Sequence, residues 1–224
     1  KSLFSKFNDR FCICIIQNEP GYNETGKYSR NLRSKINYED FLMTFYINAS
    51  QRDSVLRISH TLKQCILDHQ EKWSELVFLC IGTDRVTGDC LGPFVGQKLS
   101  SCSTPDFTVY GTLFQPVHAL NLTAMYSFIR KRHPEALIVA IDASLGQKKH
   151  LGYVTIANGA LYPGAAIHKQ LPSVGHIHIT GIVNVSGVLE QLTLQTTRLS
   201  TVVFLADTIV QGILEMIPVT DLRS

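Results

Sequence analysis

The spacing of apolar residues alternates along the chain between a helical repeat and short continuous apolar runs, which predicts alternating helices and strands. Between Ser54 and His69, apolar residues recur three and four positions apart, which predicts an amphipathic helix. The continuous apolar run ELVFLCIG, from Glu75 to Gly82, is typical of a strand buried on both faces of a sheet. The stretches that follow indicate a helix, a strand, a helix and a third buried strand: PFVGQKLSS, FTVYG, HALNLTAMYSFIRKRH and ALIVAID. This alternation predicts parallel α/β units.

The pattern changes after Asp142. The stretches LGYVTIANG and HIHITGIVN alternate partly with a period of two and predict two more strands, separated by the proline- and glycine-containing loop LYPGAAIHKQLPSVG. One broad apolar face from about Arg198 to Ile217 predicts a long helix that belongs to the core. Residues 1–50 are irregular and contain the polar, turn-rich stretch NEPGYNETGKYSRN. We therefore predict an irregular amino-terminal tail or extension over 1–50 and a single α/β domain over 51–224.

Composition narrows the class of protein. The chain has 224 residues, 45% of them hydrophobic and 17% charged, with a net charge of +3, as expected for one globular core. It has no basic stripe with interleaved aromatic residues, so we expect no nucleic-acid partner. The six cysteines form no C-x-x-C pair, which indicates reduced thiols in a cytoplasmic protein. The run FCICII is too short to span a membrane, and we expect neither a membrane partner nor a targeting segment.

Candidate chemistry lies in two segments that follow buried strands. The loop GTDRVTGDCLGP follows the first strand and carries Asp84 and Asp89, and the segment IDASLG ends the third strand with Asp142 as its first polar residue. If the strand order is 2-1-3, the first and third strands are neighbours, and ligands bind beyond their carboxyl ends. The sequence therefore predicts that the three aspartates meet at one crevice.

Each aspartate also has a purely structural interpretation. Asp89 is a residue type favoured at helix N-caps, although Pro93 at the first helical position would make Gly92 the cap. Asp142 could brace a turn at a strand end. The third aspartate, Asp84, could form a local ion pair with its neighbour Arg85 that shapes the loop.

Two carboxyl groups that face each other have a clear chemical use. They cannot both ionise cheaply, so one keeps its proton and acts as a general acid while the other activates water. The same pair could instead bind a divalent cation with help from histidine. The histidines considered are His118, His168, His176 and His178. The structural alternative for His176 and His178 is that they lie on the polar side of an exposed strand. For His118 it is that an ordinary polar residue starts a helix. Cys90 has a carboxylate neighbour, which raises a thiol's pKa, and is interpreted as a small buried residue.

Five motifs together resemble one family, from about Tyr38 to the last helix. They are FLCIGTDRVTGDCLGPFVG, YGTLFQPVHALNL, VAIDASLG, PGAAIHKQLPSVG and ITGIVNVSG. They closely resemble the YyaC-type sporulation protein family, which is similar to the germination protease of spore-forming bacteria and more distantly to hydrogenase-maturation endopeptidases. The resemblance implies a three-layer αβα sandwich with a mostly parallel twisted sheet, of the phosphorylase/hydrolase-like and hydrogenase-maturation-protease-like kind.

The resemblance also implies a site. The segments TGDCLGP and IDASL match the two aspartate motifs of the germination protease, which places the catalytic roles on Asp89 and Asp142. The PGAAIHK loop would line the same cleft through His168 and Lys169. In the hydrogenase-maturation enzymes the matching acids look like metal ligands, so a metal here would use the two aspartates and a histidine such as His168. The remaining residues expected to line the cleft or bind substrate are Thr83, Asp84, Arg85 and His118.

Two departures from the family pattern lie outside the aspartate motifs. Ala166 replaces a glycine of the PGAGV-like loop, and His176 stands where the family commonly has an acid. We therefore expect an aspartate-dependent endopeptidase of sporulation or germination, acting without a cofactor on a spore protein in the cytoplasm of the forespore or spore core. The alternatives are a metal-dependent or metal-sensing hydrolase that uses a divalent metal, and a non-catalytic binding protein. Oligomerisation is left open.

Overall fold

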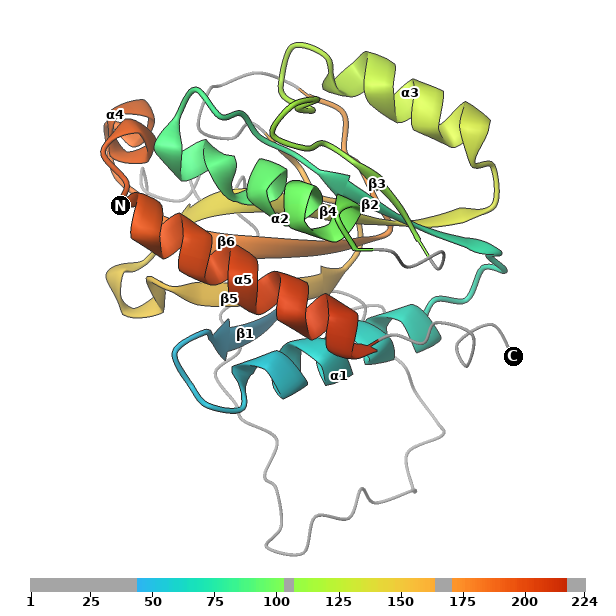
Figure 1. The fold of residues 1–224 in the computed structure, drawn as a ribbon, viewed down its shortest axis with the longest axis horizontal. Coiled ribbons are helices and arrows are strands. Elements are labelled where there is room, and N and C mark those ends of the chain that lie inside the picture. Colours follow the sequence, from blue (N-terminus) through green and yellow to red (C-terminus); the bar gives the residue numbers. More distant parts are fainter. Residues whose placement is uncertain (1–43, 103–106, 164–170, 217–224) are drawn as a thin grey trace, which may run out of the picture.

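Six strands form one mixed sheet in the order β1-β5-β6-β4-β2-β3 (Figure 1). The computed structural model describes residues 44–102, 107–163 and 171–216. The strands are β1 (Thr44–Asn48), β2 (Glu75–Cys80), β3 (Thr108–Tyr110), β4 (Ala136–Gly146), β5 (Tyr153–Asn158) and β6 (Ile177–Val185). The helices are α1 (Ser54–Leu67), α2 (Leu91–Ser100), α3 (Leu122–Arg132), α4 (Glu190–Gln195) and α5 (Leu199–Met216), with 3-10 turns η2 (Thr87–Cys90) and η3 (Lys148–His150).

Most of the sheet is parallel, as the alternating pattern predicted. Strand β4 runs parallel to both of its neighbours, β2 and β6, and β3 runs parallel to β2. Strand β5 is antiparallel to β6 and β1, so it runs against the other strands of the described sheet. The order β3-β2-β4 is the predicted 2-1-3 arrangement, and the prediction of an α/β fold is confirmed.

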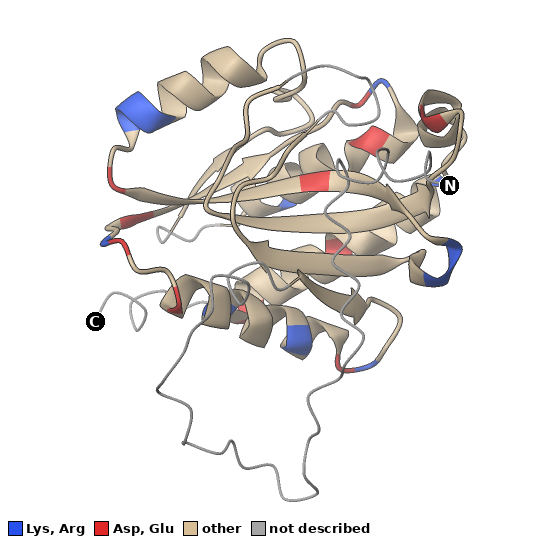
Figure 2. Ribbon diagram, turned by 180° about the vertical axis from the view of Figure 1, so that it is seen from behind, with Lys and Arg blue, Asp and Glu red and all other residues tan. Residues whose placement is uncertain are grey.

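Helices cover both faces of the sheet and make it the middle of three layers. Helices α1, α2 and α5 pack on one face, and α3 lies over the other (Figures 1 and 2). The residues of β2 alternate between the two sides: Phe78 belongs to the larger hydrophobic cluster with the first three helices, and Leu79 to the smaller one with α3. Successive strand residues point to opposite faces, so a strand with helices on both sides must be apolar at every position. This explains the uninterrupted apolar run LVFLC, from Leu76 to Cys80.

Some boundaries differ from the predicted ones. Residues Thr44–Asn48 were assigned to the irregular extension, but they form β1, which pairs with β5 and buries Ile47. Residues 1–43 of that extension lie outside the described residues. Strand β4 continues past Asp142 to Gly146, and the short helix α4 was not predicted. Each of these segments is short or polar, so its local pattern is weak, and pairing or packing within the tertiary structure decides its conformation.

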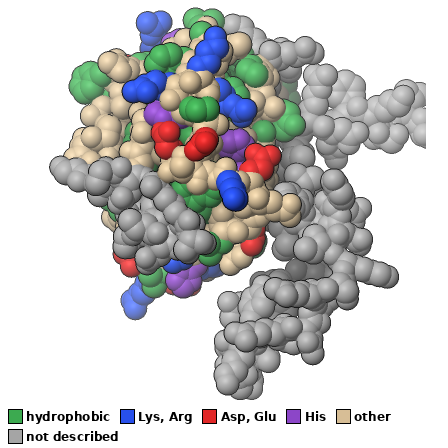
Figure 3. Space-filling view, turned by 90° about the vertical axis from the view of Figure 1, so that its right-hand side faces the viewer, with side chains coloured by type: hydrophobic (Ala, Val, Ile, Leu, Met, Phe, Trp, Pro, Cys, Tyr) green, Lys and Arg blue, Asp and Glu red, His purple; other side chains and the backbone are tan. Residues whose placement is uncertain are grey.

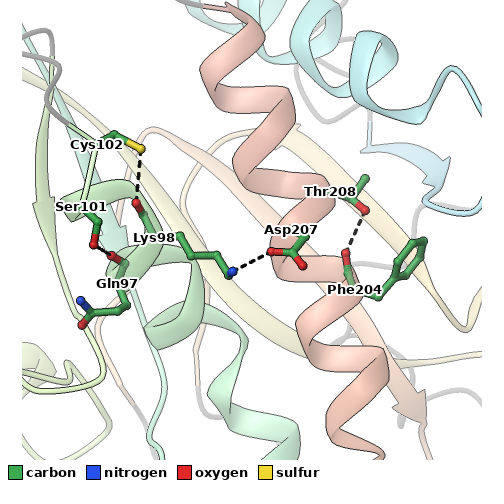
Figure 4. Close-up of polar contacts among 7 residues, drawn as sticks. All are labelled: Gln97, Lys98, Ser101, Cys102, Phe204, Asp207 and Thr208. Atoms are coloured by element: carbon green, nitrogen blue, oxygen red, sulfur yellow. Dashed lines mark hydrogen bonds and ion pairs between the residues drawn. The ribbon is translucent and has the colours of Figure 1, made fainter.

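Helix α5 packs in the core as predicted. Among the described helices it has the length and mean hydropathy, 1.5, that a membrane-spanning helix would need, but half of it is buried inside the protein. It packs along α1 and α2, and on its outer side Asp207 forms an ion pair of 2.8 Å with Lys98 of α2 (Figure 4). Its buried residues are Val202, Leu205, Ala206, Thr208, Ile209, Val210, Gly212, Ile213 and Met216.

The Lys98–Asp207 pair is expected to contribute little to stability. The two side chains are 39% and 43% exposed, so water and salt screen their attraction. Replacing Lys98 by methionine should change the free energy of unfolding by less than about 1 kcal/mol. Urea denaturation of Lys98→Met, Asp207→Asn and the double variant measures the coupling. A coupling energy of several kcal/mol would contradict this expectation.

Candidate functional site

Asp89 is held by a loop that folds back on the end of β2. Gly82 follows that strand with a φ of +140°, and a Cβ at this position would lie 2.0 Å from the carbonyl oxygen of Asp89. That carbonyl accepts a hydrogen bond of 3.1 Å from the backbone N–H of Thr83. The loop can therefore close only because residue 82 lacks a side chain and tolerates a positive φ. The result is a partly buried Asp89 in the turn η2, directly ahead of α2.

The interpretation of Asp89 as a helix cap is wrong. Helix α2 begins at Leu91, and the residue in the N-cap position is Cys90, which makes no side-chain capping bond. Pro93 is therefore the third helical residue rather than the first, and Gly92 is not the cap. Proline is still accommodated there, because the first N–H groups of a helix have no intrahelical partner.

Asp142 lies inside β4 rather than at its end. Strand β2 stops at Cys80, which pairs with Ile141, so Asp142 is the first residue of β4 beyond that pairing. On its other side β4 stays paired with β6, where Thr180 is the partner of Asp142. The Asp142 side chain is only 9% exposed, and its Oδ1 accepts a hydrogen bond of 2.8 Å from the N–H of Ala143. A buried carboxyl group therefore stands where the neighbouring strand ends.

The two carboxyl groups interact and both resist ionisation. Burial raises the pKa of Asp142 well above its usual value, the charge of Asp89 raises it further, and the Ala143 N–H partly opposes this. Burial also raises the pKa of Asp89, opposed by the Thr83 N–H and by His118. Two negative charges that interact in a buried site are costly, so a state in which the pair holds one proton is favoured. The structure thus brings Asp89 and Asp142 together, as the strand order predicted, while their catalytic roles stay a prediction.

The raised pKa of Asp142 predicts a pH-dependent effect on stability. The carboxyl group binds its proton more tightly when folded, so its contribution to stability is complete below about pH 4, the pKa of unfolded aspartate, and is lost as the pH rises through the folded pKa. An asparagine side chain cannot ionise. The variant Asp142→Asn should therefore match the wild type in acid and become the more stable protein towards neutral pH. Chemical denaturation at several pH values tests this, and a difference that does not vary with pH would contradict it.

The structure places some of the residues predicted to line the cleft at the carboxyl pair, and others lie outside the described residues. The backbone N–H of Gly82 donates to the carbonyl of Val117 at 2.8 Å, which brings the neighbouring His118 to the loop of Asp89. The His118 Nδ1 accepts a hydrogen bond of 3.3 Å from the N–H of Leu120, so the imidazole is oriented by the turn before α3 rather than by the helix itself. The structure therefore places Thr83 and His118 beside the carboxyl pair. His168 and Lys169 lie outside the described residues.

Asp84 and Arg85 do not form the expected ion pair. Both are exposed, and within residues 44–102 no salt bridge joins them. The loop is shaped instead by main-chain hydrogen bonds and by the N–H of Arg85, which donates to the Thr83 hydroxyl at 3.3 Å. The interpretation of this pair as a loop brace is wrong.

Cys90 is a structural residue, as predicted. Burial raises the pKa of its thiol, and the charges of Asp89 and Asp84 raise it further. Its Sγ–H contacts the carbonyl oxygens of Thr83 and Val86, both at 3.4 Å. A thiol that stays protonated is a poor nucleophile, so Cys90 helps to hold the loop.

The two histidines of the HIHIT stretch do not lie on an exposed strand. Strand β6 is internal, between β5 and β4, and both imidazoles are half-buried. His176 precedes β6 and accepts a hydrogen bond from the N–H of Ile138, while His178 donates from Nδ1 to the carbonyl of Gly159 at 3.0 Å. The side chain of His176 therefore replaces a ladder hydrogen bond at the start of β6.

A row of three hydroxyl groups that begins beside Asp142 was not predicted as part of the site. In the register of the sheet Asp142 lies opposite Thr180 of β6, which lies opposite Thr155 of β5. The Thr155 and Thr180 hydroxyls are 2.7 Å apart, and the Ser144 hydroxyl is 3.1 Å from that of Thr180. The spacing of Asp142 and Ser144 was visible in the sequence, because residues two apart in a strand share a face. Only the register shows that the threonines extend this polar row.

The described residues supply two carboxylates for a metal but no complete set of ligands. In the part of the chain that the structure describes, no group of three or more histidine, cysteine, aspartate or glutamate side chains could hold a metal ion. The third ligand that the resemblance implied, His168, lies outside that part. A divalent metal is therefore an alternative that a chelator can test.

The fold and the site define the class: an α/β protein with a pair of carboxyl groups at the carboxyl end of its central parallel strands. The chain belongs to a family described as protein of unknown function (DUF1256), whose pattern matches residues 46–212. It is 49% identical over 138 residues to the uncharacterized protein YyaC of Bacillus subtilis (strain 168), an alignment that covers 62% of this chain and 67% of that protein. The predicted relationship to the YyaC family is therefore confirmed.

A solved structure also shows a likeness. The NiFe hydrogenase maturation protease HycI from Thermococcus kodakarensis KOD1 superimposes with a TM-score of 0.41 and 17% sequence identity. The superposition covers 68% of this chain and 98% of HycI.

Proposed function

We propose that this protein is a hydrolase that cleaves a peptide bond with Asp89 and Asp142 acting together on a water molecule. One observation carries the proposal: two carboxyl groups from separate parts of the chain interact at the carboxyl end of the central strands, and both have raised pKa values. Groups with such shifts are concentrated at catalytic sites. A pair that shares one proton contains both the base and the acid that hydrolysis needs.

The surroundings of the pair support a different role for each carboxyl group. Asp89 is less buried, and the Thr83 N–H and His118 favour its charged form, so it is the carboxylate that takes a proton from water. Asp142 is more deeply buried and faces the charge of Asp89, so it keeps its proton. The resulting hydroxide attacks the peptide carbonyl carbon, and Asp142 protonates the leaving nitrogen as the C–N bond breaks. Asp142 then holds the negative charge, and transfer of the proton from Asp89 restores the starting state.

The substrate we propose is a protein of the spore, cleaved in the cytoplasm of the forespore or spore core without a cofactor. The resemblance of the TGDCLGP and IDASL segments to the aspartate motifs of the germination protease supports this choice. The hydroxyls of Ser144 and Thr180 lie beside Asp142 and could hold the main chain of such a substrate through hydrogen bonds.

The test is to incubate the purified protein with an extract of spore proteins and identify new termini by mass spectrometry. Cleavage by the wild type that persists with a chelator and is lost in Asp89→Asn and Asp142→Asn would support the proposal. Cleavage that a chelator stops and a divalent cation restores would favour the metal-dependent alternative. No cleavage of any protein in the extract would favour a non-catalytic binding protein.

A further inference from the structure

A polar cavity lies at the opposite end of the sheet from the carboxyl pair. Parallel strands bring their amino ends to one edge, and here the connection from α1 to β2, the connection from α3 to β4 and the start of β6 meet. The cavity has a volume of about 70 Å³. Its lining consists of His69, Glu71, Lys72, Trp73, Arg130, Pro134, Glu135, Ala136 and His176. Figure 3 shows acidic, basic and histidine side chains gathered on this side of the molecule.

The imidazole of His176 lies in this lining and is held in one orientation, with Nε2–H as a hydrogen-bond donor. Its backbone N–H donates to the carbonyl of Ile138 at 2.8 Å, and its Nδ1 accepts from the N–H of the same residue at 2.9 Å. In the neutral imidazole the proton must then be on Nε2, so this nitrogen is a donor. The ring of His69 lies 5.3 Å away, centroid to centroid. The orientation and the tautomer of His176 are therefore set by the backbone of β4.

Charged side chains of both signs surround this histidine. The pKa of His176 is lowered by burial and then by His69 and Arg130, whereas Glu71 raises it, so a cation and an anion both act on one ring. Lys72 and Glu135 add one more charge of each sign to the lining. Within the described ranges, no salt bridge joins any of these four charged side chains to another.

We propose that this cavity binds a small zwitterion that carries both an ammonium and a carboxylate group, either an α-amino acid or a short peptide with free ends. The formal charges of the lining cancel, so a ligand with a single charge is attracted by one pair of side chains and repelled by the other. A zwitterion engages both pairs. Its carboxylate accepts hydrogen bonds from Arg130 and from Nε2–H of His176, and its ammonium lies against Glu71 and Glu135.

The proposed site is separate from the carboxyl pair. Ala136 of the lining and Asp142 stand six residues apart on β4, which corresponds to about 20 Å along an extended strand. A ligand in this cavity cannot touch the reacting atoms at Asp142. The proposal therefore does not depend on the proposed hydrolysis, and each can fail without the other.

Binding can be measured by nuclear magnetic resonance with three related probes: Gly-Gly, acetyl-Gly-Gly and Gly-Gly amide. Gly-Gly should shift the amide signals of Ala136 and His176 but not that of Asp142, and each blocked peptide should bind at least about tenfold more weakly. Free glycine distinguishes the two kinds of ligand. It should bind as tightly as Gly-Gly if the site takes an amino acid, and more weakly if the site takes a peptide. Inorganic phosphate serves as the probe for a simple anion site.

Two variants test the two charges separately. Arg130→Gln and Glu71→Gln should each weaken Gly-Gly binding at least about tenfold, while Lys131→Gln, next to Arg130 but outside the lining, should leave it unchanged. Equal binding of all three peptides, binding of phosphate as tight as that of Gly-Gly, or no shift of these amides at about 10 mM would overturn the proposal. Loss of binding in the Lys131 variant would also overturn it, because net charge alone would then explain the effect.

Discussion

Replacing either Asp89 or Asp142 by asparagine is expected to lower the rate of peptide-bond hydrolysis by about 100- to 10,000-fold while the fold is retained. Asparagine has nearly the shape of aspartate but can neither take a proton from water nor give one to a leaving group. The Asp142 Oδ1 hydrogen bond to the Ala143 N–H survives in the amide, because its carbonyl oxygen still accepts. The measurement is the initial rate on a peptide that spans a cleavage site found in the extract.

The control for this experiment lies in the same loop. Asp84 is five residues before Asp89, but it is exposed and forms no salt bridge with Arg85. The variant Asp84→Asn should keep at least about half of the wild-type activity, as expected for an exposed residue outside the carboxyl pair. Full activity in Asp89→Asn or in Asp142→Asn would refute the shared-proton mechanism, whatever the result for Asp84.

A large loss of stability is expected for Gly92→Ala. A Cβ at Gly92 would lie 2.1 Å from the carbonyl oxygen, 2.7 Å from the nitrogen and 2.8 Å from the carbonyl carbon of Ile81. These are backbone atoms at the end of β2, so no side-chain rotation relieves the clash, and α2 must move away from the sheet. We expect a loss of at least about 3 kcal/mol in the free energy of unfolding.

The movement of α2 also links stability to the site. Asp89 lies in the turn η2 immediately before α2, so a displaced helix carries Asp89 away from Asp142. Activity of Gly92→Ala should therefore fall even at temperatures where the variant is folded. Gly187→Ala is the matched control, because a Cβ there meets no atom within 4 Å and the change should stay within about 0.5 kcal/mol. A melting temperature of Gly92→Ala equal to that of the wild type would show that the helix is not held this closely.

The order of the main elements could be read from the chain because each has a strong local signal. The run LVFLC, from Leu76 to Cys80, contains no polar residue, as expected for a strand between two helical layers. The amphipathic period from Ser54 and the apolar face of α5 are equally clear. Strand β1 has only five residues, so its pairing with β5 could not be foreseen.

The candidate site was partly predictable for a geometric reason. With an assumed strand order of 2-1-3, the first and third strands neighbour each other and end at one edge, so the acids that follow them are expected to lie near one another. The loop GTDRVTGDCLGP contains two aspartates, Asp84 and Asp89. The resemblance of its motif to the germination protease selected Asp89 as the member of the pair. The hydroxyl row of Ser144, Thr155 and Thr180 depends on the register of three strands, which no local pattern specifies.

The sequence by itself determined the α/β class and the membership of the YyaC-like family, because both follow from periodicity and motifs along the chain. It predicted neighbouring positions for the two aspartate segments only on the assumption of a 2-1-3 strand order, which the sheet confirms. Only the tertiary structure decided that Asp142 lies within β4, because pairing with β6 continues after β2 has ended. It also decided that both carboxyl groups resist ionisation and that His176 belongs to a cavity at the far edge, since burial and the approach of distant charges exist only in the folded chain.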